Sequence, residues 1–396
     1  MQFDHIKTED HLRRFCQEMS SAACVAFDTE FVSEDSYRPD LCLIQVAVSG
    51  RLAVIDTKSI DDVSVFWNWI VSPGHETLVH SGREELRFCW WATGARPTEL
   101  FDTQIAAALI GLEYPAAYST LIGRLLDKSL SKDETRTDWR KRPLTQRQIE
   151  YALLDVAYLE PVRDHLAKKL DRLDRRSWLT TEMETWQDEV IAAESSERWR
   201  RVSGISGLST RSLAVVRALW GWREDEAERR NIPPRRMMRD DLIIELAKRQ
   251  TADPKRIAAI RGLEFGHWQK HMPKISAAID QAMTLPDGDC PRLSRGNSFQ
   301  QLSLLGQFIS TALGSICREA KVAPSLVGTV QDIRELLADR LGMRSKSEPP
   351  PALAQGWRAE VVGNVVDELL KGKLAVRIAD PLSDEPLAFE QLPSDK

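Results

Sequence analysis

The stretch ACVAFDTEFV, residues 23–32, decides the fold of the N-terminal part of this chain. It is an apolar, β-rich run into which two acids are set, Asp28 and Glu30. Because side chains at positions i and i+2 of a strand share one face, both carboxylates point the same way. Burying two carboxylates side by side is costly unless a cation neutralises them. The motif alone leaves two interpretations open: a metal-binding strand, or an exposed edge strand with ordinary surface acids.

The segments after this strand predict an α/β domain. Residues 41–50 and 51–57 are typical of two strands, and the turn dipeptide Ser49-Gly50 between them favours an antiparallel hairpin. The alternation of strands and helices that follows predicts a mixed sheet flanked by helices. The further elements expected are helices over 61–71, 84–91 and 104–112, and strands over 77–81 and 100–103.

A second polar pair lies in IEYALLDVAYL, residues 149–159. Thr145, with Gln148 three residues later, predicts the capped start of a helix, and Tyr151 and Asp155 share one face of that helix. Taken alone, they could be a core tyrosine and a boundary acid. Together with the D-x-E strand and an acidic patch midway, they can hold two divalent cations about 3.5–4 Å apart for phosphodiester hydrolysis. Magnesium or manganese suits such all-oxygen ligands.

Four segments of the chain together closely resemble the ribonuclease D family. That family belongs to the DEDD exonucleases, in the subgroup with a tyrosine in its third motif, and the resemblance spans about residues 1–170. It implies a ribonuclease-H-like fold and 3′→5′ hydrolysis that releases nucleoside monophosphates. The segments are FDTEF (27–31), HSGREEL (80–86), LFDTQIAA (100–107) and ETRTDWRKRPLTQRQIEYALLDVAYL (134–159).

The resemblance also implies roles for individual residues. Asp28 and Glu30 match the metal ligands of the first motif, and Asp155 matches the ligand of the third motif. Tyr151 matches the tyrosine that orients the attacking water. Because an unperturbed tyrosine has a pKa near 10, Tyr151 suits positioning better than proton abstraction. The implied cofactors are two divalent cations, Mg2+ or Mn2+.

One position departs from the family's pattern. The second motif usually carries aspartate where this chain has Glu85, in the run GREEL. Glutamate keeps the charge and the ligand atoms but is one methylene longer, so either its helix sits slightly back or the second cation binds more weakly. We expect Glu85 to be the ligand, with Glu84 and Asp102 as alternatives. Asp102 and Asp138 could instead be helix caps.

Three further side chains near these motifs have two interpretations each. His80 could be a catalytic base, but we favour a half-buried histidine with its hydrogen bonds satisfied. The stretch KDETRTDW, residues 132–139, is predicted to be a loop beside the site. Arg136 in this loop and Arg140 just after it could contact substrate phosphates or could be solvated charges.

After about residue 200 the pattern becomes helical. Residues 211–263 resemble an HRDC domain, the helical module found in helicases and at the C-terminus of ribonuclease D. Trp220 and Trp222 lie on an apolar-rich helix in this segment. We expect them in the core, because base stacking needs exposed aromatic side chains.

The same helical segment carries a concentration of basic residues. Residues 205–285 hold 15 Lys or Arg against 10 Asp or Glu. Clustered arginines favour phosphate contact and release counterions on binding, although they could equally form a solvated helical face. The candidates for substrate contact are Arg229, Arg235 and Arg236, with Arg230 and Arg239 beside them.

The chain therefore divides, by prediction, into three domains. Residues 1–200 form the exonuclease domain with trailing helices, residues 205–288 form the HRDC-type domain, and residues 295–390 form a second HRDC-like helical domain. The Pro-rich stretch RSKSEPPPA (344–352) is predicted to be a loop or linker in the last of these.

The bulk properties are those of an ordinary globular protein. The net negative charge, taken alone, is weak evidence against a nucleic-acid-binding protein, but the distribution of charge along the chain matters more. The chain has 396 residues, of which 42% are hydrophobic and 29% charged, and its net charge is −5. No long apolar run predicts a membrane span. The N-terminal residues 1–15 show a helical pattern and lack the features of a signal peptide. The six cysteines form no CxxC pair, which favours buried thiols in a reduced cytoplasm over disulfides or zinc.

We therefore expect a cytoplasmic, monomeric 3′→5′ exoribonuclease that does not engage a membrane. Its partner would be RNA with a 3′ end, such as transfer RNA precursors. Two alternatives stay open: a DNA 3′→5′ exonuclease, because the site chemistry does not choose the sugar, and a non-catalytic nucleic-acid-binding protein.

Overall fold

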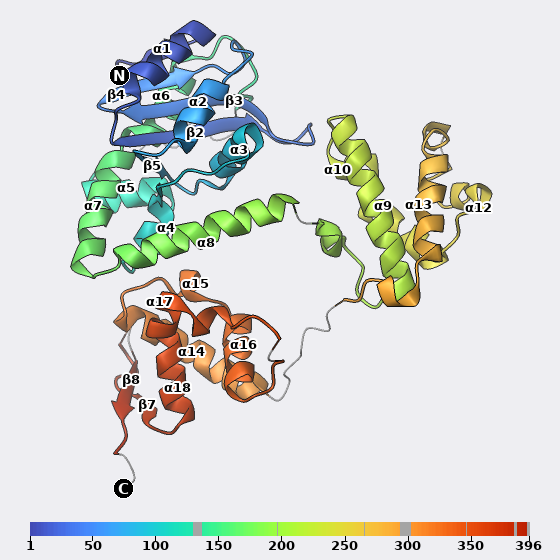
Figure 1. Cartoon of the computed structure of the whole chain (residues 1–396). Coiled ribbons are helices and arrows are strands. Elements are labelled where there is room, and N and C mark those ends of the chain that lie inside the picture. The colour runs from blue at the N-terminus through green and yellow to red at the C-terminus, as the bar shows by residue number, and fades with distance from the viewer. Residues whose placement is uncertain are drawn as a thin grey trace.

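The N-terminal part of the computed structural model is built on a mixed β-sheet (Figure 1). The structure describes residues 1–129, 137–195, 197–264, 266–293, 302–345, 347–383 and 386–393. Six strands lie in the order β1-β4-β3-β2-β5-β6, in which β3 is antiparallel to β2 and β4 and the other neighbours are parallel. The predicted mixed sheet is thus confirmed. The strands are β1 (Asp4–Ile6), β2 (Cys24–Val32), β3 (Asp40–Val48), β4 (Arg51–Ile55), β5 (Glu76–Val79) and β6 (Leu100–Asp102).

Most strands lie where the sequence predicts them, and β1 is the exception. β3 and β4 meet at Ser49 and Gly50, whose φ angles of 50° and 74° give the tight hairpin turn. The N-terminal segment, predicted as helical, instead begins with Asp4–Ile6 paired in parallel with residues 53–55. Three residues are too few to show a strand's alternation, so the pairing with β4 defines this strand.

Helices cover both faces of the sheet. Phe27 of β2 packs edge-on against Phe66 of α2, with ring centroids 5.6 Å apart, on the face that α1 and α3 also cover. Ala26, which points the opposite way, joins the core formed by α4, α5, α7 and α8. The predicted capping box of α6 at Thr145 and Gln148 is confirmed. The helices are α1 (Glu9–Met19), α2 (Ser64–Val71), α3 (Arg83–Thr93), α4 (Thr103–Ala108), α5 (Tyr118–Leu126), α6 (Gln146–Ala157), α7 (Leu159–Arg172) and α8 (Arg176–Ser195).

The helices after residue 200 form a body with its own core, which stands to one side in Figure 1. A short 3-10 helix, Arg198–Arg201, leads into it. Trp222 lies in this core, as predicted, but Trp220 is only half-buried and lines a cavity, so the core prediction is incomplete for Trp220. The helices are α9 (Thr210–Arg229), α10 (Pro234–Met237), α11 (Asp240–Arg249), α12 (Pro254–Ala258) and α13 (Met272–Thr284).

The C-terminal part is helical but ends in a hairpin that the sequence did not predict. β7 (Leu374–Ile378) and β8 (Leu387–Gln391) pair antiparallel. The apolar side chains of these helices share one core with α4, α7 and α8 of the N-terminal part. The helices are α14 (Ser303–Glu319), α15 (Pro324–Val327), α16 (Val330–Arg340), α17 (Gly356–Arg358) and α18 (Asn364–Leu370), with a π-helical turn at Ala359–Gly363.

Helix α8 joins the N-terminal and C-terminal parts, and in Figure 1 it runs between them. Its Glu182 accepts hydrogen bonds from Trp357 Nε1 at 3.1 Å and from both terminal nitrogens of Arg358, at 2.6 and 2.8 Å. Trp178 of α8 stacks on Trp357 with ring centroids 5.4 Å apart. No helix among the described residues is long and apolar enough to cross a membrane.

We predict that Glu182→Ala destabilises the protein by about 3 kcal/mol, because it leaves the Arg358 guanidinium without its carboxylate inside the junction. Urea unfolding gives the free energy, and limited proteolysis reports release of the C-terminal helices. The control is Glu184→Ala, an exposed glutamate on the same helix, which should change stability by less than about 0.5 kcal/mol. Equal stability of the two variants would contradict the role of Glu182.

Candidate active site

Strand β2 and helix α6 bring the predicted acids together. Asp28 and Glu30 lie on one face of β2, and α6 packs on the sheet through Ile149 and Leu153. Asp155 on α6 is close enough to affect Asp28: burial, and then the Asp155 carboxylate, raises the pKa of Asp28 to about 8. Burial raises the pKa of Asp155 itself to about 7. Acidic groups are therefore concentrated here, and no Lys or Arg among the described residues forms an ion pair with them.

Glu30 and Tyr151 belong to the same group. Burial raises the pKa of Glu30 to about 9, and Asp28, Asp155 and Glu85 each add to the rise. Burial, followed by Asp155, Glu30 and Asp28, also raises the pKa of the Tyr151 hydroxyl. Tyr151 thus keeps its proton at neutral pH and can donate one hydrogen bond and accept others.

The position that departs from the family's pattern, Glu85, lies in the first turn of α3 and is buried. Its Oε1 accepts a hydrogen bond of 2.5 Å from the Thr29 hydroxyl. Burial, and then Asp28, raises the pKa of Glu85 to about 8. By strand alternation Thr29 points away from Asp28 and Glu30, so Glu85 is held beside the other acids by a contact on the opposite face of β2.

The two alternatives to Glu85 are engaged elsewhere. Glu84 binds Arg87 at 2.6 Å, one helical turn away. Asp102 is buried and caps α4 through the backbone nitrogen of Gln104 at 2.8 Å, and it also accepts hydrogen bonds from the backbone nitrogens of Ser81 and Gly82. The cap interpretation of Asp102 is confirmed, and Glu85 is the residue of the three that interacts with Asp28 and Glu30.

His80 has both ring nitrogens hydrogen-bonded, as we expected. Nδ1 lies 2.9 Å from the Thr103 hydroxyl and Nε2 lies 3.1 Å from the Ala116 carbonyl oxygen. Burial lowers the pKa of the imidazole. A ring with both nitrogens engaged and a preference for the neutral form is poorly suited to act as a general base.

The four predicted substrate-contacting arginines that the structure describes are exposed, and each is paired with an acid. Arg136 lies outside the described residues. Arg140 binds Asp138 at 2.9 Å and Asp35 at 3.3 Å, and Arg236 binds the same Asp35 at 2.8 Å. Arg140 and Arg236 therefore meet at one carboxylate, although they lie almost a hundred residues apart in the sequence.

Two other arginines of the basic cluster are paired within the helical body. Arg229 binds Glu226 at 2.5 Å and Arg235 binds Asp240 at 3.1 Å. Arg229, and then Lys274, lowers the pKa of Glu226 to about 2. None of these ion pairs joins the cluster to Asp28 or its neighbours, so the arginines are separate from the acidic site.

Comparisons with known proteins agree with this arrangement. Residues 3–171 match the family model of a 3′-5′ exonuclease, and residues 212–279 match that of an HRDC domain. The ribonuclease D of Gluconacetobacter diazotrophicus is 32% identical over 377 residues, which cover 94% of each chain. The chain belongs to the ribonuclease D family. The ribonuclease D of Acidiphilium cryptum is also 32% identical, over 375 residues and 94% of each chain.

A solved ribonuclease D shows the same architecture. The crystal structure of Escherichia coli RNase D, an exoribonuclease involved in structured RNA processing, matches with a TM-score of 0.80 at 27% identity. The match covers 94% of this chain and 99% of that one. A protein from Bifidobacterium adolescentis shares the fold, with a TM-score of 0.69 at 22% identity. The ribonuclease-H-like exonuclease domain followed by an HRDC domain is therefore confirmed.

The exonuclease family is generally dependent on divalent metal ions, so we tested whether this site suits them. Among the described residues, no three His, Cys, Asp or Glu side chains already stand in a metal-ligating arrangement. The donor set nevertheless fits, because four carboxylates, one buried and three half-buried, offer the oxygen ligands that Mg2+ and Mn2+ prefer. Burial raises the pKa of each of these carboxyl groups, and a bound divalent cation would favour their charged forms.

Two residues of this site were missed in the sequence. Thr29 holds Glu85, but a threonine in a strand carries no signal of such a role. Gln45 of β3 lies directly across from Asp28 and is fully buried, and its amide makes no hydrogen bond within the part of the chain described. An amide inside the apolar run LCLIQVAV was the available signal, because such a group is costly to bury without a partner.

We predict that Asp28→Asn makes the metal-free protein more stable. The folded pKa of Asp28, about 8, lies above its ordinary 3.8, so the folded state retains a proton that the unfolded chain releases. Stability is therefore full below about pH 4 and falls as the pH rises towards 8. In the presence of chelator at pH 8, the variant should melt about 2–4 °C higher, equivalent to about 1 kcal/mol.

The control for this measurement is Asp225→Asn, which removes an exposed carboxylate on α9 and should leave the melting temperature unchanged. Added Mg2+ should raise the melting temperature of the parent protein and have a smaller effect on Asp28→Asn. If Asp28→Asn melted at a lower temperature than the parent at pH 8, the charged form of Asp28 would not be destabilising the folded protein, and the prediction would be wrong.

Proposed function

We propose that this chain is a 3′→5′ exoribonuclease that removes nucleoside 5′-monophosphates from RNA 3′ ends, with transfer RNA precursors among its substrates. One observation carries the proposal: four carboxylates and one tyrosine from three elements share one site, and no basic side chain in the described part of the chain is paired with these acids. The protein pays a free-energy penalty to keep them there, which a binding role alone does not require. The similarity to ribonucleases D supports RNA as the substrate.

Each residue of the site would have its own role in the reaction. Asp28, Glu30, Glu85 and Asp155 would hold Mg2+ or Mn2+, which supplies water activation and stabilises the leaving oxygen. Tyr151 lies one helical turn before Asp155 and keeps its proton, so its hydroxyl would orient the attacking water by a hydrogen bond. Thr29 would fix the carboxylate of Glu85.

A test of the proposed function uses RNA labelled at its 5′ end and a DNA of the same sequence, each with Mg2+, with Mn2+ or with chelator. We expect stepwise shortening of the RNA from its 3′ end, monophosphate products and no cleavage in chelator. Asp28→Asn should lower kcat by more than the 10–100-fold typical of a residue that only supports a metal ligand. Asp225→Asn is the control and should keep full activity.

Each alternative has its own outcome in that experiment. Preferential shortening of the DNA would replace the proposal with a DNA exonuclease. Tight RNA binding without cleavage by the parent protein would favour the non-catalytic alternative. Cleavage that survives chelation, or that Asp28→Asn leaves intact, would refute the metal-dependent site.

A separate prediction concerns Glu85. Glu85→Asp should retain activity, because it keeps the carboxylate and restores the residue usual in the family. Glu85→Gln should lower activity by at least about 10-fold and raise the Mg2+ concentration needed for half-maximal rate, because it removes the charge. Glu84→Gln is the matched control, since Glu84 faces Arg87 instead of Asp28. If Glu85→Asp and Glu85→Gln were both as active as the parent, the assignment of Glu85 would be wrong.

A further inference from the structure

A groove lies between the exonuclease domain and the HRDC domain, away from the acidic residues. It consists of two adjoining cavities of about 390 and 430 Å³, each within the usual range for a ligand site of about 300–1,000 Å³. We call the two together the interdomain groove. The cavities share Arg198, Trp220, Glu224 and Pro234 in their lining.

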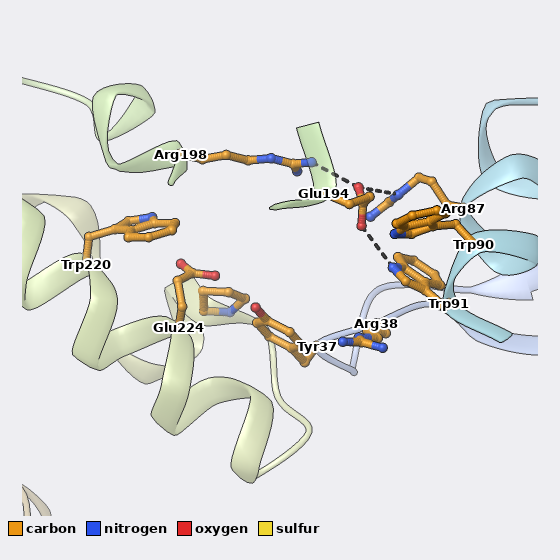
Figure 2. A pocket seen from close by; sticks show the side chains of 10 residues that line it. Tyr37, Arg38, Arg87, Trp90, Trp91, Glu194, Arg198, Trp220 and Glu224 are labelled. Atoms are coloured by element: carbon orange, nitrogen blue, oxygen red, sulfur yellow. Dashed lines mark hydrogen bonds and ion pairs between the residues drawn. The ribbon is translucent and has the colours of Figure 1, made fainter. Parts of the chain in front are cut away.

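The walls of the interdomain groove are aromatic. Figure 2 shows Trp220 of α9 on one wall, directed into the cavity, and Trp90 and Trp91 of α3 on the other, with Tyr37 along the floor. The three tryptophans are only partly buried. Aromatic faces that remain accessible in a cavity are what base stacking requires, and such stacking is tolerant of sequence.

The groove also differs from the rest of the chain in charge. Six arginines and three acids line it, whereas the whole chain has a net charge of −5. The acids are Glu194, Glu224 and Asp240. Arginine binds phosphate bidentately and also stacks on bases, so this composition favours a nucleic-acid backbone. The arginines are Arg38, Arg87, Arg198, Arg201, Arg223 and Arg235.

One acid, Glu194 at the end of α8, fixes the geometry of a wall. Its carboxylate accepts hydrogen bonds from Arg87 Nε at 2.9 Å, Arg198 Nη2 at 3.0 Å and Trp91 Nε1 at 3.0 Å. Arg87 also binds Glu84 at 2.6 Å, so two guanidinium groups and two carboxylates balance one another in this wall. Arg87 also lies over the Trp91 ring, 4.6 Å from its centroid. The wall is therefore held in place before any ligand binds.

The free arginine of the groove is Arg201. It is exposed, and within the described residues it makes no ion pair. Arg198, in contrast, is anchored to Glu194 and to the Ala193 carbonyl oxygen. Arg201 can thus form a new contact with phosphate without losing an existing one.

The groove connects to the acidic site through two elements. Helix α3 carries Glu85 in its first turn and Trp90 five residues later, about 8 Å further along the axis at about 1.5 Å per residue. Tyr37 and Arg38 follow strand β2, which carries Asp28 and Glu30. RNA whose 3′ end reaches the acids would therefore have nucleotides further from that end within reach of the groove.

We propose that the interdomain groove binds a single-stranded segment of the RNA substrate upstream of its 3′ end, with bases stacked on Trp220 and Trp90 and phosphates on Arg201. This inference rests on the proposed function for the identity of the ligand. The groove serves to hold long RNA while the acidic site acts on the terminal nucleotide.

The test compares kcat/KM for an RNA of about 16 nucleotides, the upper end of usual site sizes, with kcat/KM for a dinucleotide. Trp220→Leu and Arg201→Ala should each lower the ratio of long to short substrate by at least about 5-fold, since a stacked base contributes about 1–3 kcal/mol. Trp220→Phe keeps an aromatic face, so its ratio of kcat/KM for the long RNA to kcat/KM for the dinucleotide should stay close to that of the parent. Arg256→Ala, an exposed arginine on α12 outside the groove, should leave the ratio unchanged.

Binding measured separately keeps this inference distinct from the proposed function. The Asp28→Asn protein should bind the long RNA, and binding should quench its tryptophan fluorescence. When Arg201→Ala is added to this variant, the slope of the logarithm of the binding constant against the logarithm of the salt concentration should fall by about the value of one phosphate contact. If the parent protein cleaves neither substrate, the proposed function fails and this binding measurement alone decides the groove.

Two results would overturn the inference. In the first, Trp220→Leu and Arg201→Ala behave like Arg256→Ala in the substrate ratio and in binding. In the second, an acidic peptide binds as tightly as the RNA and competes with it, which would assign the groove to an acidic protein partner. Thermal unfolding of Trp220→Leu excludes misfolding as the cause of a loss, and Arg201→Ala carries the test independently because Arg201 is exposed.

Discussion

The electrostatic conflict among Asp28, Glu30, Glu85 and Asp155 is the constraint on which the rest of the structure depends. Burial raises the pKa of all four carboxyl groups to about 7 to 9, and neighbouring carboxylates add to the rise for Asp28, Glu30 and Glu85. Folding must offset this cost elsewhere. Aromatic and aliphatic cores on both faces of the sheet supply that stability. On the proposed function, stability is thereby exchanged for a site that would bind cations, a common compromise in enzymes.

The sequence predicted those parts of the fold whose signals are local. The strand at residues 23–32, the Ser49-Gly50 hairpin and the Thr145 capping box each depend on a few neighbouring residues, and all three are confirmed. The strand Asp4–Ile6 and the hairpin at residues 374–391 were missed. Both are held by pairing or packing with other segments, which a linear pattern does not contain.

The sequence predicted which acids belong to the site, but it did not predict the contacts that hold them in place. The choice of Glu85 over Asp102 becomes clear only when Asp102 is seen capping α4. Thr29 belongs to the site because its hydroxyl donates a hydrogen bond to Glu85. Gln45 belongs to it because it lies across from Asp28 on the neighbouring strand. Such roles come from tertiary contacts, so residue type and spacing alone cannot assign them.

Charge counting in the HRDC segment overestimated the free positive charge. Arg229, Arg235 and Arg236 are each paired with an acid, and such exposed pairs contribute only about 0–1 kcal/mol to stability. Trp220 packs against the HRDC core, as predicted, but it is only half-buried because it also lines a cavity shared with the exonuclease domain. The basic excess becomes informative only where Arg201 and its neighbours line a cavity.

The two helical bodies contact the exonuclease domain through different kinds of interaction. The C-terminal helices share an apolar core with α4, α7 and α8, and Glu182 binds Arg358 at the junction. The HRDC domain has its own core, against which Tyr37 of the exonuclease domain packs, and it also meets that domain through ion pairs, such as Arg38 with Glu228 at 2.8 Å and Asp35 with Arg236. Apolar burial is strong and insensitive to salt, whereas exposed ion pairs are weak and screened. A change of RNA length or of ionic strength should therefore act first on the HRDC domain, whose contacts with the exonuclease domain border the groove.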